Sequence, residues 1–226
     1  MQEQQKEIIK KLEYFAYRKN IREVFCEVIE FEALKIALLC DIHNSKIRMQ
    51  KQKEILNRYN KSDLPKFYEI CYAIEKMLVG MIDNFDDYLG GIYMKIGAAN
   101  KHNQQFFTPM SVGRLMAAIN LTELDLSKPI ISIGEPACGS GGLLLAVLEH
   151  LTEQKINYTD KVLIYANDVD KHCVNMCYLQ LSFSGAVAVI KQQNTITQAV
   201  VGETFITPAF ALQYGKFKEE YEKLCA

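Results

Sequence analysis

A glycine-rich segment, Glu135-Pro-Ala-Cys-Gly-Ser-Gly-Gly142, combines an acidic residue with a backbone that a ligand can approach closely. Glycines lack the Cβ atom that keeps a ligand away, and the helix predicted to follow offers backbone N–H groups to a carboxylate or phosphate. The Glu135 carboxylate can hold a cationic amine. The alternative is a strand-to-helix turn without a ligand. A phosphate-binding P-loop is disfavoured because no Gly-Lys-Ser/Thr follows.

A second acidic segment, Asn167-Asp168-Val169-Asp170, follows a predicted strand. In doubly wound nucleotide-binding folds, an acid at this place accepts hydrogen bonds from ribose hydroxyls. We assign that role to Asp168, and we expect Asp170 to cap the next helix. Asp168 alone would indicate a cap or a solvated acid, but together with the glycine-rich segment it predicts ribose binding.

A third segment, Gln105-Phe-Phe-Thr-Pro109, carries a helix-start signal. Threonine before proline predicts an N-cap at Thr108 and a helix over 110–119. On the simplest interpretation the segment is only that cap, and Phe106 and Phe107 are core residues.

The elements that must position these residues change character along the chain. From Lys128 onward, short β-branched runs alternate with helical spacing, which predicts a parallel, right-handed, doubly wound α/β sheet. Strands are expected over 129–134, 162–166 and 186–190, a fourth near 203–206, and helices over 142–151 and 171–182. Before that point, apolar residues recur at three- and four-residue steps. We expect helices over 3–18, 22–60 with a break near His43 to Ser45, 65–82 and 85–98. We therefore divide the chain into a helical region, 1–99, and an α/β domain, 100–226.

Composition and charge exclude several classes of protein. The net charge is -1 and 49% of residues are hydrophobic, which is typical of a globular protein and not of a strongly basic nucleic-acid binder. Neither a signal peptide nor a membrane-spanning run is found, so we expect a cytoplasmic protein without a membrane partner. Seven scattered cysteines indicate reduced thiols. Cys173 and Cys177 beside His172 could suggest a metal, but buried helix cysteines are the better interpretation, and no metal site is predicted.

A basic run within the helical region has two interpretations, a contact with a phosphate backbone or a solvated helix face, and we favour the second. It consists of Lys46, Arg48, Lys51, Lys53, Arg58, Lys61 and Lys66.

The three segments, in this order, resemble the modification (M) subunits of type I restriction–modification systems and related γ-class DNA adenine-N6 methyltransferases. Those proteins carry Gly-Gln-Phe-Phe-Thr-Pro, then Asp-Pro-Ala-Cys-Gly-Ser-Gly-Gly, then an acid after the second strand. They also carry Asp-x-Leu-Gly-x-x-Tyr, which overlaps Asp87-Tyr-Leu-Gly-Gly-Ile-Tyr93 here with one shifted step. The resemblance covers about residues 86 to 197. It implies a Rossmann-like S-adenosylmethionine-dependent methyltransferase fold, shortened here to a truncated parallel sheet, with an N-terminal helical region.

By this resemblance the cofactor is S-adenosylmethionine, and nine residues would hold it. Its methionine part would contact Phe107, Thr108, Pro109, Glu135, Ala137, Gly139 and Gly141. The ribose would be bound by Asp168, and the adenine ring would meet Asn194.

The catalytic motif of the family, Asn/Asp-Pro-Pro-Phe/Tyr, is degenerate in this chain. The adenine amino group is a poor nucleophile, so an amide or carboxylate oxygen and a backbone carbonyl must accept its hydrogens while an aromatic ring stacks on the flipped base. The nearest match is Thr207-Pro208-Ala209-Phe210, in which a threonine hydroxyl replaces that acceptor. Thr207, Pro208 and Phe210 are the catalytic candidates by resemblance, and a simple turn is the alternative. Gln104 and Glu135 replace a glycine and an aspartate of the family pattern.

The sequence thus predicts an S-adenosylmethionine-binding, DNA methyltransferase-like protein, specific for adenine N6 if active. The alternative is an inactive relative that binds cofactor, DNA or a partner subunit, and a methyltransferase for small molecules or proteins is a weaker third reading. DNA is the expected substrate. The family sheet has about seven strands, and a shorter sheet exposes an apolar edge. We expect that edge to be covered by the helical region, by a protein partner or second copy, or by more of a longer chain.

Overall fold

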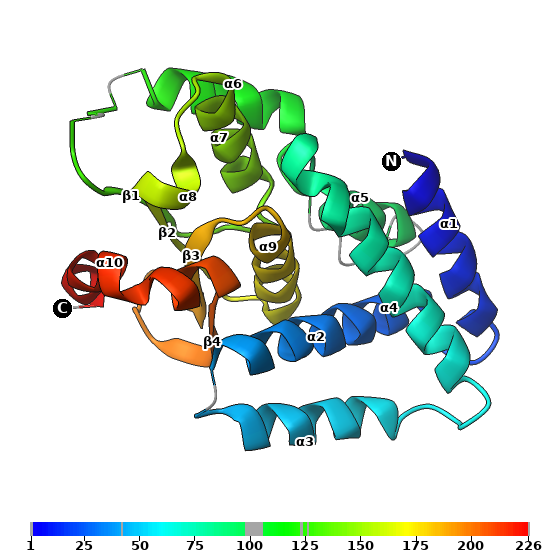
Figure 1. The fold of residues 1–226 in the computed structure, drawn as a ribbon. Helices are drawn as coiled ribbons and strands as arrows, with labels where there is room; N and C mark the ends of the chain where they lie inside the picture. Colours follow the sequence, from blue (N-terminus) through cyan, green and yellow to red (C-terminus); the bar gives the residue numbers. More distant parts are fainter. Residues whose placement is uncertain (1, 42, 98–105, 123, 126, 226) are drawn as a thin grey trace.

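The computed structural model describes residues 2–41, 43–97, 106–122, 124–125 and 127–225, in which a layer of helices packs against one small sheet (Figure 1). The N-terminal helices are α1 (Gln2–Leu12), α2 (Ile21–Cys40), α3 (Ser45–Leu56), α4 (Leu64–Val79) and α5 (Tyr88–Gly97), with short 3-10 turns η1 (Glu13–Phe15) and η2 (Gly80–Asp83). They lie within or close to the predicted ranges, and the break between α2 and α3 falls at the predicted place. Asn20 starts α2 by accepting a hydrogen bond from the Arg22 N–H at 2.9 Å.

The sheet has four strands in the order β1 (Ile131–Glu135), β2 (Val162–Asp168), β3 (Val187–Gln193) and β4 (Val200–Ile206). The first three are parallel and are joined by α7 (Gly142–Glu153), α8 (Tyr158–Lys161) and α9 (Lys171–Phe183). The fourth differs from the expectation of a parallel sheet, since it runs antiparallel to β3. The connection over 194–199 explains this, because a parallel crossover needs about a dozen residues or more.

The two faces of the sheet pack against different helices. On one face, Ile164, Ala188 and Ile190 belong to the large core that includes the N-terminal helices. On the other face, Leu163, Val187 and Val189 are covered by Phe210 and Phe217 of α10 (Pro208–Cys225). The strands are therefore buried on both sides, which explains their nearly continuous apolar sequence.

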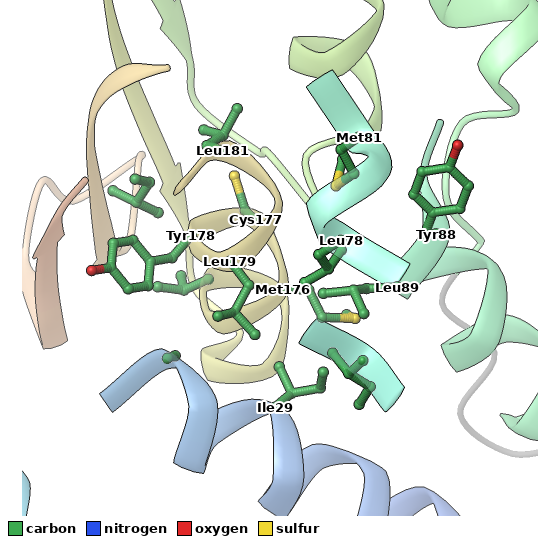
Figure 2. Close-up of a cluster of buried hydrophobic side chains, with 14 of the residues drawn as sticks. Ile29, Leu78, Met81, Tyr88, Leu89, Met176, Cys177, Tyr178, Leu179 and Leu181 are labelled. Atoms are coloured by element: carbon green, nitrogen blue, oxygen red, sulfur yellow. The ribbon is translucent and has the colours of Figure 1, made fainter. Parts of the chain in front are cut away.

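Helix α9 lies at the centre of the molecule, between the sheet and α2. Every residue from Cys173 to Leu181 is buried, as expected for a helix that is packed on all sides. Figure 2 shows Met176 and Leu179 of this helix among Ile29 of α2, Leu78 of α4 and Leu89 of α5. Burying one such side chain stabilises the fold by about 1.5–3 kcal/mol. The N-terminal helices and the sheet thus share one core.

Within the described part of the chain, one edge of β1 pairs with no strand and one side of α6 (Met110–Asn120) is exposed. Strand β1 pairs only with β2, so its other edge is open there. Helix α6 packs on α7 through Gly113 and Ala117, which are buried. Its opposite side exposes apolar side chains at helical spacing, namely Val112, Leu115, Met116 and Ile119.

The basic run over residues 46–66 is largely engaged in internal ion pairs. Arg48 is 1% exposed and pairs with Asp41 at 3.1 Å and Glu203 at 3.5 Å. Further pairs are Lys51 with Glu203, Arg58 with Glu27, and Lys66 with Glu69. This favours a structural role for the run over contact with a phosphate backbone. Among the described residues, no helix is both long and apolar enough to cross a membrane.

Candidate functional site

A pocket of about 430 Å³ opens where β1 and β2 end. Three segments line it: residues 106–108 with Met116, residues around the glycine-rich loop from Glu135 to Leu143, and Asp168 with Cys173. Ligands of open α/β sheets bind at the carboxyl ends of the strands, and this pocket lies there. Its volume is within the usual range for a small-molecule site.

The glycine-rich loop has a backbone shape that favours glycine. Gly139 and Gly141 have φ angles of +52° and +97°, in the left-handed region. The loop is held against β2, because the Cys138 N–H donates to the Asn167 carbonyl at 2.8 Å and the Gly139 N–H donates to Asp168 Oδ2 at 2.9 Å. Helix α7 begins directly after the loop, and its first turn directs N–H groups toward the loop end of the helix.

Both acidic residues of the pocket also organise the backbone beside them. Asp168 Oδ1 accepts a hydrogen bond from the Asp170 N–H at 2.9 Å, and Glu135 Oε1 accepts one from the Ala137 N–H at 3.0 Å. Asp170 in turn caps α9 by accepting from the His172 N–H at 2.7 Å, as predicted. Each acid fixes a turn and still borders the pocket, where its carboxylate can accept hydrogen bonds from a ligand.

The Phe106–Pro109 segment closes one side of the pocket. A Cβ on Gly139 would lie 3.0 Å from Phe107 Cδ1, so the aromatic ring packs directly on the glycine loop. The rings of Tyr93 and Phe107 are 5.7 Å apart. The prediction that Thr108 caps α6 is wrong: Pro109 occupies the cap position, with no side-chain cap hydrogen bond, and Thr108 lines the pocket instead. Gln104 and Gln105 lie outside the described residues.

Six of the nine predicted cofactor residues line this pocket, namely Phe107, Thr108, Glu135, Ala137, Gly139 and Asp168. The other three, although described, are not among the lining residues. Pro109 starts α6, and Gly141 packs against Cys177, whose sulfur would be 3.2 Å from a Cβ there. Asn194 Oδ1 accepts from the Ile196 and Thr197 N–H groups, and the next residue, Thr195, donates to the Pro136 carbonyl at 2.5 Å. The β3–β4 turn therefore contacts the glycine loop.

The structure does not bring Thr207, Pro208 or Phe210 to the pocket. Because β4 is antiparallel, it ends near the start of β3, at the opposite end of the parallel strands from Glu135 and Asp168. Thr207 is 0% exposed, and its hydroxyl donates to the Ala186 carbonyl at 2.7 Å and accepts from the Ala188 N–H at 3.0 Å. Phe210 is buried under the sheet. This placement argues for the simple turn and against the catalytic role that the resemblance implies.

Sequence reasoning missed several residues of the pocket wall. Leu143 and Cys173 lie in the first turns of α7 and α9, and Met116 lies on α6. The first two follow directly from the position of the pocket, because helix starts border the carboxyl edge of a parallel sheet. Met116 could be found only from the packing of α6 on α7.

The thiols near the pocket are buried rather than reactive. Hydrogen bonding with Cys177, together with burial, raises the pKa of the Cys138 thiol well above its ordinary value, and burial also raises the pKa of Cys173. Burial lowers the pKa of His172. Within the described ranges, no group of three His, Cys, Asp or Glu side chains is arranged to hold a metal ion. Nothing in this geometry favours a metal at His172, Cys173 and Cys177.

The fold is that of the class I S-adenosylmethionine-dependent methyltransferases. A structure from Listeria monocytogenes, described as a class I S-adenosylmethionine-dependent methyltransferase, superposes with a TM-score of 0.51 at 20% identity. The match covers 89% of this chain and 56% of the Listeria chain. The family described as N-6 DNA Methylase matches residues 83–217, more than half of the chain. The chain therefore belongs to the N-6 DNA methylase family.

Two curated relatives agree with this family. The type I restriction enzyme MpnII methylase subunit of Mycoplasma pneumoniae is 28% identical over 135 residues, or 60% of this chain. The type I restriction enzyme MjaIX methylase subunit of Methanocaldococcus jannaschii is 29% identical over 126 residues, or 56% of this chain. The matched regions span only 22% and 21% of those relatives. The family and the fold support S-adenosylmethionine as the cofactor.

Proposed function

We propose that this chain is a cofactor-binding part of a DNA adenine-N6 methyltransferase system, with S-adenosylmethionine in the pocket at the ends of β1 and β2. The observation that carries the proposal is the convergence of the glycine loop, Phe107 and Asp168 around one cavity. Gly139 lets Phe107 pack on the loop at this cavity, since a Cβ there would lie 3.0 Å from Phe107 Cδ1.

The roles follow from the chemistry of the lining groups. Asp168 accepts hydrogen bonds from the ribose hydroxyls, and Glu135 attracts the cationic amine of the methionine part. The first turn of α7 offers its N–H groups to the carboxylate. Phe107 and Thr108 bound the methionine end. Once bound, S-adenosylmethionine supplies an activated methyl group, and the residues of this chain hold and orient it.

Methyl transfer needs an acceptor for the adenine amino hydrogens, and the position of Thr207 does not support that role for this residue. We propose that adenine-N6 transfer to DNA requires an acceptor motif from outside these 226 residues. The runner-up is a chain that binds cofactor or a partner without transfer, and the position of Thr207 and Phe210 favours it over transfer by the chain alone. A labelled-methyl assay on duplex DNA distinguishes the two when candidate partner subunits are added.

The unpaired edge of β1 and the exposed side of α6 support a protein partner or a second copy as the covering element. An unpaired strand edge is a template for another strand, and Met116, one of the exposed apolar residues of α6, also lines the pocket. Sedimentation velocity over a concentration series tests self-association, with Leu115→Lys as the comparison. A monomer at all concentrations would leave a partner protein as the remaining proposal.

The first experiment is titration calorimetry of S-adenosylmethionine into the wild-type chain and Asp168→Ala. We expect micromolar binding that the substitution weakens by about tenfold or more, because a charge-assisted hydrogen bond is lost. Asp160→Ala is the matched control, since Asp160 lies in α8, at the other end of β2. Absence of binding at millimolar cofactor, with no thermal shift, would overturn the proposal.

A further inference from the structure

One motif of the sequence, Asp87-x-x-Gly90, has no role in the pocket just described. Asp87 lies immediately before α5 and is buried, and it is absent from the described residues that line the pocket. Its carboxylate nevertheless contacts the glycine loop at Ser140. Ser140 Oγ donates to Asp87 Oδ2 at 2.5 Å, although the two residues are 53 positions apart.

Three different segments donate hydrogen bonds to this one carboxylate. Besides Ser140, the Gly90 N–H donates to Asp87 Oδ1 at 2.9 Å, and Gln180 Nε2 of α9 donates to the same oxygen at 2.9 Å. A buried carboxylate is stable only when such donors replace the water that it has lost. Burial raises the pKa of Asp87, and these three hydrogen bonds oppose that shift.

Gln180 closes the network. Its Nε2 also donates to the Ser140 carbonyl at 2.7 Å, and its Oε1 accepts from the Leu89 N–H at 3.1 Å. Gln180 and Ser140 are 0% and 1% exposed, so water does not compete for these groups. The start of α5, the glycine loop and the middle of α9 are therefore joined by one set of buried hydrogen bonds.

The glycines around Asp87 leave no room for a side chain. A Cβ on Gly90 would lie inside 3.0 Å of both Asp87 Oδ2 and Ser140 Oγ, and a Cβ on Gly142 would lie 3.3 Å from Asp87 Oδ2. Gly90 thus explains the second half of the motif: its missing side chain lets the carboxylate reach the loop.

We propose that Asp87 is a positioning residue that holds the Ser140 turn of the glycine loop in its cofactor-binding shape. The inference rests on the proposed function of the pocket. Asp87 acts through Ser140, which lines the pocket, while Asp87 itself is not among the lining residues. The network fixes the loop at Ser140, while Asp168 fixes it at the neighbouring residue by accepting the Gly139 N–H.

The test is a double-mutant cycle on S-adenosylmethionine affinity with Asp87→Asn and Ser140→Ala. Asp87→Asn keeps the size but places an amide donor where donors already point, so we expect affinity to fall about tenfold. Ser140→Ala alone should weaken binding to a similar degree. Because both act through one contact, adding Ser140→Ala to Asp87→Asn should change the dissociation constant less than about twofold.

If Asp87 served only the stability of the fold, the variants would give a different pattern of affinities and exchange rates. Arg48→Ala should destabilise the fold at α3 and β4, which do not line the pocket, and we expect it to leave the affinity of the folded protein unchanged. Amide hydrogen exchange over Gly139 to Gly142 gives a second readout, which should accelerate in Asp87→Asn and not in Arg48→Ala. Ser140→Ala, which removes one hydroxyl, serves if Asp87→Asn fails to fold.

The outcomes separate the two proposals. If the wild-type chain binds no S-adenosylmethionine, the proposed function itself fails. If the wild type binds and Asp168→Ala binds more weakly, while Asp87→Asn and Ser140→Ala bind within about twofold of wild type, only the positioning role is overturned. Additive losses in the cycle would also overturn it, because they would show that the two residues act separately.

Discussion

At the scale of single residues, some of the polar side chains that the sequence singles out line the pocket, whereas others serve only the fold. Asp168 and Glu135 border the pocket and fix turns, whereas Thr207 satisfies backbone groups of β3 at the far end of the sheet. The degenerate catalytic motif therefore has a structural explanation. A threonine is suited to this place because its hydroxyl both donates and accepts.

Thr207→Val tests this explanation. Valine keeps the shape but leaves the Ala186 carbonyl and the Ala188 N–H without their hydroxyl partner, so we expect a loss of about 1–3 kcal/mol in the free energy of unfolding. Urea denaturation measures the loss, and calorimetry should show unchanged cofactor affinity. The exposed Thr197→Val serves as control. Weaker cofactor binding by folded Thr207→Val would contradict the structural role.

At the scale of elements, spacing predicted most of the helices and strands, because apolar periodicity and burial agree in elements such as α2 and α4. Helices α8 and α10 were not predicted, and α6 turns its apolar spacing outward. The direction of β4 was missed, although the short connection over 194–199 carried the signal. The network of Asp87, Ser140 and Gln180 could not be predicted, since it depends on contacts between segments far apart in the chain. The position of the pocket follows from the sequence, because its acids and glycines directly follow strands. Asn194, which was predicted to meet the adenine ring, is not among the lining residues, because its side chain closes its own turn.

Arg48 connects two elements that the sequence does not relate, α3 and β4. Its guanidinium donates to the Ala37 and Thr204 carbonyls and pairs with Asp41 and Glu203. We expect Arg48→Ala to cost about 1–3 kcal/mol of unfolding free energy, because it leaves two backbone carbonyls and two half-buried carboxylates without this partner.

Lys46→Ala, an exposed position on the same helix, should change stability by less than about 0.5 kcal/mol. Urea denaturation compares the two variants. Equal stability of Arg48→Ala and wild type would show that the ion pairs do not hold α3 to the sheet.

At the scale of the whole molecule, the N-terminal helices and the sheet share a core that runs through α9. The division at residue 99 that the sequence suggests therefore remains a proposal. It separates the helical region from the α/β domain and does not imply that either part folds alone. A shared core predicts a single cooperative unfolding transition, because neither part can lose its packing alone.

The pH dependence of stability follows from a buried acid in the helical layer. Burial raises the pKa of Glu32 to about 7, although Lys35 opposes the shift, while the neighbouring Glu75 adds to it. An acid whose folded pKa exceeds its unfolded value binds more protons when folded, so its stabilising contribution is present at low pH and is lost as pH rises through 7.

Between about pH 6 and pH 8, ionisation of Glu32 should remove about 1 kcal/mol of unfolding free energy. Urea denaturation across that range measures it. Glu32→Gln, which cannot ionise, should flatten the curve, whereas Glu30→Gln, a partly exposed position on the same helix, should leave it intact. An unchanged slope in Glu32→Gln would assign the dependence to other groups.

The buried thiol of Cys177 offers a measure of how often the glycine loop opens locally. Cys177 of α9 is 0% exposed and lies against Gly141, so it meets an alkylating reagent only when the loop separates from α9. Its labelling rate therefore reports how often that separation occurs, since modification traps the open form. A bound ligand that holds the loop closed would slow the labelling without touching the Cys177 sulfur.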